Sequence, residues 1–208
     1  MKKSKRIKKS NSWKIKQHRD QFFKKSKTLG YRSRASFKLI ELNKKFKFLK
    51  KNSYLLDLGS SPGGWTQVAN KIILNGKILA IDIKDMEPVD NVKFIKTDVL
   101  DESTKNKVIK YFDGRLDIII SDMAADTTGN KTLDSIRTNQ LCTDVIEFAK
   151  KTLKPEGVLV SKLFMGEDFI EVKNLAKSIF KKVNFFKPKS SRSESKETYL
   201  HCVSLKSL

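Results

Sequence analysis

The chain has 208 residues and a formal net charge of +21 at neutral pH, from 44 Lys/Arg and 23 Asp/Glu. This length is sufficient for the core of one domain, and 38% hydrophobic residues is typical of a globular protein. The apolar runs are too short for a transmembrane helix, and no secretory signal is evident. With only two cysteines and two histidines, neither a disulfide framework nor a metal centre is expected, and we predict a cytoplasmic protein.

The basic charge is concentrated at the beginning of the chain. Residues 1–50 hold 19 Lys/Arg against two acidic residues, whereas the other 158 residues hold 25 basic and 21 acidic ones. Residues 1–30 also lack apolar periodicity, so we predict a flexible or weakly helical basic arm there and a single folded domain over residues 31–208. An arm of this kind favours nucleic acid, whose phosphates it would neutralise; a membrane surface or an acidic protein is the alternative.

From Ser33 onward, helix and strand patterns alternate. Apolar residues at positions 35, 39, 42, 46 and 49 predict a first amphipathic helix. Strands are predicted at Tyr54–Leu58, Lys77–Ile83, Val92–Thr97, Asp117–Asp122 and Gly157–Leu163, with helices near Gly64–Leu74, Glu102–Tyr111, Leu133–Leu153 and Asp168–Phe180. Two further extended segments, Val183–Pro188 and Thr198–Leu205, are close enough to form an antiparallel edge hairpin. Nearly continuous apolar strands need helices on both faces, so we predict an α/β fold with a Rossmann-like, mostly parallel sheet.

The stretch DLGSSPGGW, Asp57–Trp65, is a glycine-rich turn directly after the first predicted strand, where a backbone often approaches a ligand. A P-loop is excluded because Trp65 occupies the position of the phosphate-binding lysine. A dinucleotide fingerprint is excluded because Ser61 occupies the position of its second glycine. The turn therefore predicts a ligand other than a nucleotide polyphosphate or a dinucleotide.

Two aspartates extend this candidate site along the same edge of the sheet. Asp82 ends the second predicted strand, where a carboxylate can accept both ribose hydroxyls, and Asp98 ends the third. Either one alone could be an ordinary turn residue, but both together with the glycine turn favour a ligand site. A ligand with a ribose, an adenine amino group and no phosphate matches these groups, and S-adenosylmethionine is such a ligand.

Five motifs resemble those of the FtsJ/RrmJ (RlmE) family of ribosomal RNA 2′-O-methyltransferases. They are YRSRASFKL (Tyr31–Leu39), DLGSSPGGW, SDMAAD (Ser121–Asp126), VSKLF (Val160–Phe164) and SRSESKETYL (Ser191–Leu200), and the similarity runs in order from about Arg19 to the C-terminus. The resemblance implies a methyltransferase fold, S-adenosylmethionine as cofactor and large-subunit ribosomal RNA as substrate.

The resemblance also implies specific site residues. The catalytic tetrad of the family falls on Lys38, Asp122, Lys162 and Glu197. Its cofactor contacts fall on Gly63, Trp65, Asp82, Asp98 and Asp122, with Asp57 and Gly59 shaping the floor. One departure is Ala125-Asp126, where the family usually has proline and asparagine; the loss of the proline predicts a looser loop.

Methyl transfer to a hydroxyl requires alignment of the two reacting groups and removal of a proton. Lys162 ends an apolar strand and is the expected general base, which requires a neutral amine; Lys38 would be a cationic neighbour that orients the ribose. Taken singly, each lysine could instead be a solvated surface charge, and Tyr199 could be plain core.

We therefore expect a methyltransferase that modifies a uridine 2′-hydroxyl of the 23S ribosomal RNA during ribosome assembly. Its partners would be ribosomal RNA or the large ribosomal subunit and not a membrane, and it would act as a monomer. The alternatives are a transfer RNA 2′-O-methyltransferase and a non-catalytic RNA-binding assembly factor on the same fold.

Overall fold

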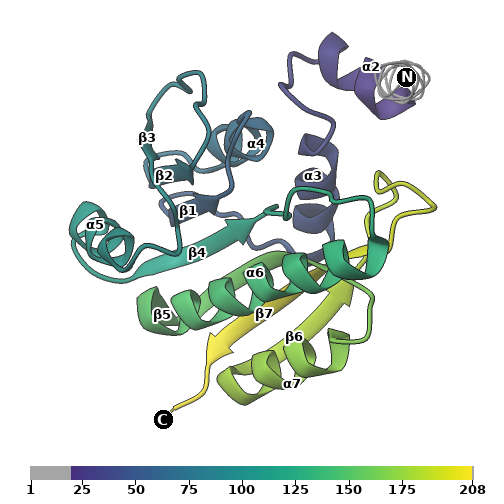
Figure 1. Cartoon of the computed structure of the whole chain (residues 1–208). Coiled ribbons are helices and arrows are strands. Elements are labelled where there is room, and N and C mark those ends of the chain that lie inside the picture. Colours follow the sequence, from purple (N-terminus) through teal and green to yellow (C-terminus); the bar gives the residue numbers. More distant parts are fainter. Residues whose placement is uncertain (1–19, 208) are drawn as a thin grey trace.

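The computed structural model describes residues 20–207, which form a seven-stranded sheet with helices on both faces (Figure 1). The helices are α2 (Gln21–Thr28), α3 (Ser36–Phe46), α4 (Gly64–Ile72), α5 (Glu102–Phe112), α6 (Lys131–Thr152) and α7 (Phe169–Ile179). The strands are β1 (Tyr54–Leu58), β2 (Lys77–Asp82), β3 (Val92–Lys96), β4 (Leu116–Ser121), β5 (Leu153–Phe164), β6 (Phe180–Phe186) and β7 (Glu197–Leu205). The strand order is β3-β2-β1-β4-β5-β7-β6.

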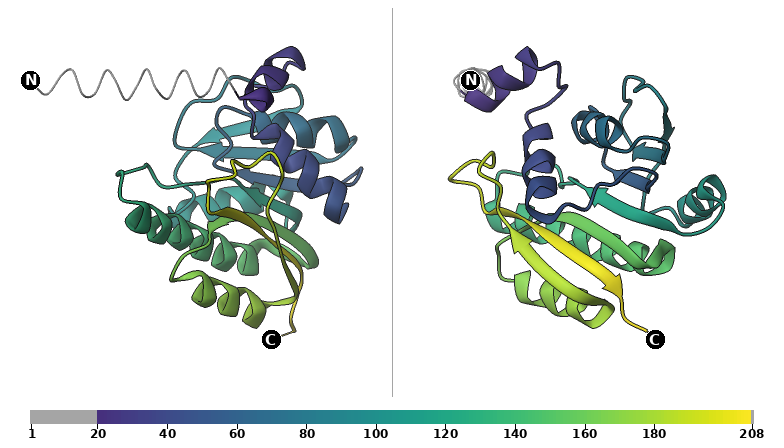
Figure 2. Two further views of the ribbon diagram at one scale, coloured as in Figure 1. Left: turned by 90° about the vertical axis from the view of Figure 1, so that its right-hand side faces the viewer. Right: turned by 180° about the vertical axis from the view of Figure 1, so that it is seen from behind.

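The five strands from β3 to β5 are parallel, and β7 pairs antiparallel with both β5 and β6. The predicted mostly parallel sheet with an antiparallel edge hairpin is therefore confirmed. Viewed from the side, α6 and α7 lie on one side of the sheet and α3 on the other (Figure 2).

Successive side chains of each strand point to opposite faces of the sheet, and this divides the core into two clusters. Leu56, Ile119 and Leu159 pack with buried side chains of α5, α6 and α7. Their neighbours Leu55, Ile118 and Val160 pack with α3 and α4 on the opposite face. Because successive side chains of a strand point to opposite faces, Lys162, two positions after Val160, lies on the α3 side.

The connection between β1 and β4 decides where a ligand can bind. From β1 the chain moves outward to β2 and β3, and it then returns to place β4 on the other side of β1. In an open α/β sheet, such a reversal leaves a crevice at the carboxyl ends of the two central strands. The glycine-rich turn follows β1, and Asp122 follows β4, so both reach this crevice.

The element boundaries differ from the predicted ones where side chains cap or block a helix. α6 begins at Lys131 because the Asn130 side chain accepts hydrogen bonds from the backbone N–H groups of Thr132 and Leu133. It ends before Pro155, which cannot continue a helix, and β5 begins already at Leu153 instead of Gly157.

The last part of the predicted basic arm is a helix. Asp20 caps α2 by accepting from the backbone N–H groups of Phe22 and Phe23, and the Phe22 ring lies 5.4 Å from that of Phe37 on α3. Asp20 also forms an ion pair with Arg34, so α2 is tied to the segment that leads into α3. The remainder of the predicted arm, residues 1–19, lies outside the described residues.

Cys142 and Cys202 are both free and buried. Within residues 20–207, no group of three or more His, Cys, Asp or Glu side chains is arranged to hold a metal ion. In the same part of the chain, none of the helices has the length and apolar character required to cross a membrane.

Candidate active site

Four charged side chains from distant parts of the sequence meet on the α3 side of the sheet. Lys38 comes from α3, Asp122 follows β4, Lys162 belongs to β5 and Glu197 begins β7. The β5–β7 register aligns Lys162 with Tyr199 and Phe164 with Glu197, which places both charged residues near the carboxyl end of β5. The structure thus brings together the four residues of the expected tetrad.

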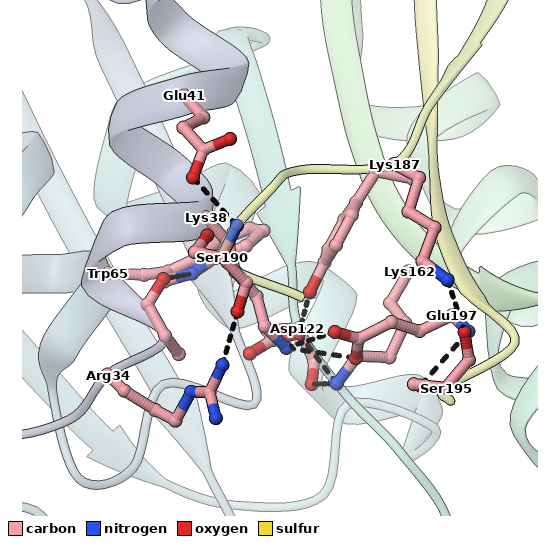
Figure 3. A network of polar contacts seen from close by, with 12 residues as sticks. Arg34, Lys38, Glu41, Trp65, Asp122, Lys162, Lys187, Ser190, Ser195 and Glu197 are labelled. Atoms are coloured by element: carbon pink, nitrogen blue, oxygen red, sulfur yellow. Dashed lines mark hydrogen bonds and ion pairs between the residues drawn. The ribbon is translucent and has the colours of Figure 1, made fainter. Parts of the chain in front are cut away.

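The tetrad consists of two ion pairs (Figure 3). Lys162 Nζ lies 2.6 Å from Asp122 Oδ1 and donates a hydrogen bond of 2.9 Å to the Asp122 carbonyl oxygen. Lys38 Nζ lies 2.8 Å from Glu197 Oε1 and 2.9 Å from Oε2. Lys38, Lys162 and Glu197 are each no more than 9% exposed. Pairing is what allows such charges to be buried, because an isolated one would be strongly disfavoured.

Both carboxylates of the tetrad are held in the ionised form. Burial alone would raise the pKa of Asp122, but Lys162 and Lys38, together with hydrogen bonds from Lys162 and Tyr199, outweigh it and lower that pKa below the ordinary value. Burial likewise opposes ionisation of Glu197, and Lys38 and Lys162 outweigh it, so the pKa of Glu197 is also lowered. The site therefore contains two fixed negative charges at neutral pH.

Tyr199 is part of the core and also contacts the tetrad. It is fully buried, and its hydroxyl donates a 2.6 Å hydrogen bond to Asp122 Oδ1. Burial raises the pKa of Tyr199 well above its ordinary value, and the negative charges of Asp122 and Glu197 raise it further. The Tyr199 hydroxyl therefore stays protonated, and it holds Asp122 in place by donating this hydrogen bond.

A cavity of about 600 Å³ lies at the crevice beside the tetrad. Four residues that the sequence predicted for the cofactor site line this cavity: Gly59, Asp82, Asp98 and Asp122. Gly59 has a φ of +71°, and a β-carbon there would collide with Met123 Cγ, so glycine is required for the approach of these two segments.

The charges of the cavity fit a cationic adenosyl ligand better than a polyphosphate. Five aspartates line it, namely Asp82, Asp98, Asp122, Asp126 and Asp144, against the two basic residues Lys84 and Arg137. Asp82 is fixed by the backbone N–H groups of Ser61 and Lys84, each at 2.8 Å, and Asp98 by that of Leu100 at 2.9 Å. Ordered carboxylates of this kind accept hydrogen bonds from hydroxyl and amino groups and attract a sulfonium or ammonium charge, so S-adenosylmethionine fits the donor set.

Three further residues of the glycine-rich segment are packed closely against other parts of the protein. Trp65 is only 3% exposed, and its indole N–H donates to the Ala35 carbonyl at 2.8 Å. Gly63, with a φ of +106°, packs so closely that a β-carbon would lie 2.7 Å from Arg32 Nη1. Asp57 is 1% exposed and accepts a 2.6 Å hydrogen bond from Thr66. Among the residues lining the cavity, neither Gly63 nor Trp65 is found.

The loop after Asp122 is fastened despite its missing proline. The Ala125 backbone N–H donates to Thr138 Oγ1 at 3.2 Å, a bond that proline could not make. Further along, Thr128 donates from both its N–H and its hydroxyl to Asp134 Oδ1, each at 2.7 Å. These bonds hold the loop against α6.

One side of the cavity was missed by the sequence prediction. Arg137, Gln140, Leu141 and Asp144 of α6 line it. Their spacing of three, one and three positions is that of a single helix face, which is visible in the sequence. The spacing could not show that this helix face lines a ligand cavity, because only the folded loop 123–130 places α6 over the crevice.

The loop between β6 and β7, residues 187–196, is clamped to α3 (Figure 3). Glu41 accepts from the backbone N–H groups of Lys189 and Ser190 at 2.6 and 2.9 Å, and Arg34 donates to the Ser190 carbonyl. Inside the loop, Lys187 Nζ donates to the Ser195 carbonyl at 2.6 Å. Because the loop leads directly into Glu197, this clamp also fixes one member of the tetrad.

Comparisons with known proteins agree with these features. The sequence model described as FtsJ-like methyltransferase matches residues 31–205. The chain is 45% identical to the ribosomal RNA large subunit methyltransferase E of Rickettsia akari (strain Hartford), over 97% of this chain and 92% of that protein. It is 42% identical to the protein of the same name from Pelagibacter ubique (strain HTCC1062), over 95% and 97% of the two chains. A crystal structure described as a ribosomal RNA methyltransferase from Plasmodium falciparum matches with a TM-score of 0.75 at 34% identity, covering 84% of this chain and 98% of that one.

Proposed function

Because the chain belongs to the FtsJ-like methyltransferase family, as its motifs predicted, we propose that it transfers a methyl group to a ribose 2′-hydroxyl of large-subunit ribosomal RNA. The observation that carries the proposal is the ion pair of buried Lys162 with half-buried Asp122 at the end of β5, beside an acid-lined cavity that fits S-adenosylmethionine. The names of the relatives support ribosomal RNA as the substrate. By the same resemblance, the acceptor is a uridine of the 23S ribosomal RNA, modified by a monomeric enzyme during ribosome assembly.

When bound, S-adenosylmethionine supplies a methyl group that is already activated by its sulfonium. The chain must therefore align the acceptor hydroxyl and take its proton. Lys162 is the proposed general base: its amine, once neutral, accepts the proton as the ribose oxygen attacks. Asp122 holds Nζ of Lys162 at 2.6 Å, and Tyr199 in turn holds Asp122 at 2.6 Å.

The second ion pair has a positioning role in this proposal. Lys38 is fixed by both oxygens of Glu197, so its amine has one defined location beside the Tyr199 ring, 5.8 Å from the ring centroid. From there Lys38 can donate a hydrogen bond to the ribose and orient its 2′-hydroxyl toward Lys162.

The proposal is tested by incubating the purified chain with labelled S-adenosylmethionine and large ribosomal subunits from cells that lack it. Label should enter the 23S RNA at one 2′-O-methylated uridine, which mapping of ribose methylation identifies. Label in transfer RNA instead would favour the alternative substrate. RNA binding without any methyl incorporation would contradict the proposal and favour a non-catalytic assembly factor.

A further inference from the structure

A second hollow, of about 290 Å³, lies between the first turns of α6 and the turn that joins β5 to α7. It is distinct from the cofactor cavity, because α6 presents Ser135 and Ile136 to the hollow and Arg137 and Gln140 to the cavity. Lys196, at the hollow, directly precedes Glu197, and its carbonyl accepts a 2.9 Å hydrogen bond from the Met165 N–H. The hollow is therefore adjacent to the strand ends that carry the tetrad.

A buried hydroxyl in this hollow has no partner within the described part of the chain. Ser135 is 8% exposed, and its Oγ forms no hydrogen bond to any of residues 20–207. It faces Gly166, where a β-carbon would lie 2.6 Å from Ser135 Oγ. The hydroxyl packs directly against Gly166, whose missing side chain makes room for it, so the accessible polar groups of the hollow are those of its rim.

The walls of the hollow are apolar and unusually exposed. Ile136 is 44% exposed and Met165 is 48% exposed, although both are large hydrophobic side chains. Methionine adapts its shape readily and makes favourable contacts between its sulfur and aromatic rings. A flat, partly apolar group with hydrogen-bonding edges would cover these side chains and reach the polar groups at the rim of the hollow.

The charges around the hollow define where an anion can lie. Lys131 and Lys196 provide positive charge, whereas Glu167 and Asp168 line the turn between β5 and α7. Asp168 is held by a 2.9 Å hydrogen bond from Asn139. The two carboxylates disfavour a phosphate inside the hollow and favour a neutral group that carries N–H donors, while the lysines can contact phosphates outside it.

We propose that this hollow binds a nucleobase of the RNA that flanks the acceptor nucleotide, and that it prefers a base with an exocyclic amino group. The inference rests on the proposed function, since it assigns a further subsite to the same RNA. An amino group of the base would donate to Glu167 or Asp168, as carboxylates accept from cytosine in nucleic-acid recognition. Met165 and Ile136 would pack on its face. Lys131 and Lys196 would contact the adjoining phosphates.

The test uses Met165→Ala and Ile136→Ala, with Leu74→Ala as the matched control. Leu74 is also 48% exposed, but it does not line the hollow. With large ribosomal subunits as substrate, each hollow variant should raise KM for the subunit about tenfold, in line with the contribution of one stacked base. The KM for S-adenosylmethionine and kcat should stay within about twofold, because the tetrad and the cofactor cavity are untouched.

Base-specific chemical probing of the complex with S-adenosylhomocysteine then locates the base. The unaltered chain should protect one base next to the mapped acceptor, and the two hollow variants should lose that protection while Leu74→Ala keeps it. Unchanged KM, no protected neighbouring base, or crosslinking of the hollow to a ribosomal protein would overturn the inference. Failure of the proposed function is distinguishable, because the unaltered chain would then transfer no methyl group to ribosomal RNA at all.

Discussion

Asp122 connects more parts of the candidate site than any other residue described above. Its carboxylate contacts Lys162 and Tyr199, and it also lines the cavity of about 600 Å³. The SDMAAD motif pointed to this residue through its resemblance to the family. It could not identify Tyr199 as a second partner, because the β5–β7 register that brings Tyr199 to Lys162 exists only in the folded sheet.

Asp57 provides a pH-dependent test at the level of one residue. The pKa of Asp57 is raised to about 7, mainly by burial. The negative charges of Asp122 and Asp82 add to this rise, and the hydrogen bond from Thr66 opposes it. Since this value lies above the ordinary 3.8, the folded state binds the proton more tightly than the unfolded chain does. Ionisation of Asp57 therefore destabilises the fold progressively as the pH rises from about 4 to about 7.

We expect Asp57→Asn to remove this dependence, because the amide oxygen can still accept from Thr66 and cannot ionise. The free energy of unfolding of the unaltered chain, measured relative to the variant in urea, should fall with rising pH. The fall should approach about 1.4 kcal/mol per pH unit below pH 7 and then level off. A difference between the two proteins that does not vary with pH would show that Asp57 is not held protonated.

At the level of elements, the sequence predicted strands better than it predicted what their ends contact. Runs such as Leu116–Ser121 are apolar on both faces, and this pattern correctly indicated a parallel sheet covered by helices. The clamp between α3 and the β6–β7 loop was not predictable, because Glu41 and Ser190 are 149 positions apart and bond through the loop backbone. Backbone donors leave no signature in a side-chain pattern.

Removal of the clamp should loosen the β6–β7 loop. Glu41→Ala leaves the backbone N–H groups of Lys189 and Ser190 without their acceptor, and hydrogen bonds to a charged group contribute about 1.5–3 kcal/mol. Amide hydrogen exchange at these two residues should therefore accelerate at least about tenfold, and kcat for methyl transfer should fall because Glu197 is less well fixed. Glu171→Ala, an exposed change on α7, serves as the control. Equal exchange rates in both variants would show that the clamp does not order the loop.

For the whole molecule, the basic charge of the first residues is separate in sequence from the proposed active site. The first 19 residues contain nine Lys/Arg and no acidic residue, whereas the tetrad and the cavity lie within residues 31–205, the span that the family model matches. Composition alone identified the basic segment. It could not identify the methylated nucleotide, because that choice depends on the shape of a folded RNA.

Deletion of residues 2–19 should weaken binding to ribosomal RNA and reduce its salt dependence. Each lost phosphate contact lowers the slope of log K against log salt by about 0.7–0.9. The methyl-transfer rate at saturating RNA should change by less than about twofold, because α2 and the tetrad remain. Filter binding between 50 and 300 mM salt measures the slope, and a slope equal to that of the full chain would contradict a phosphate-binding role.

The most direct test of the central claim compares Lys162→Met with Lys154→Met. Both lysines belong to β5 and both lie 2.6 Å from an aspartate oxygen, but Lys154 pairs with Asp117 at the other end of the strand. Single-turnover transfer of labelled methyl to large ribosomal subunits should fall at least about 100-fold in Lys162→Met, the loss expected for a general base. RNA affinity should stay within a few-fold, and Lys154→Met should transfer methyl at nearly the rate of the unaltered chain. Equal transfer rates in the two variants would contradict the assignment of Lys162 as the base.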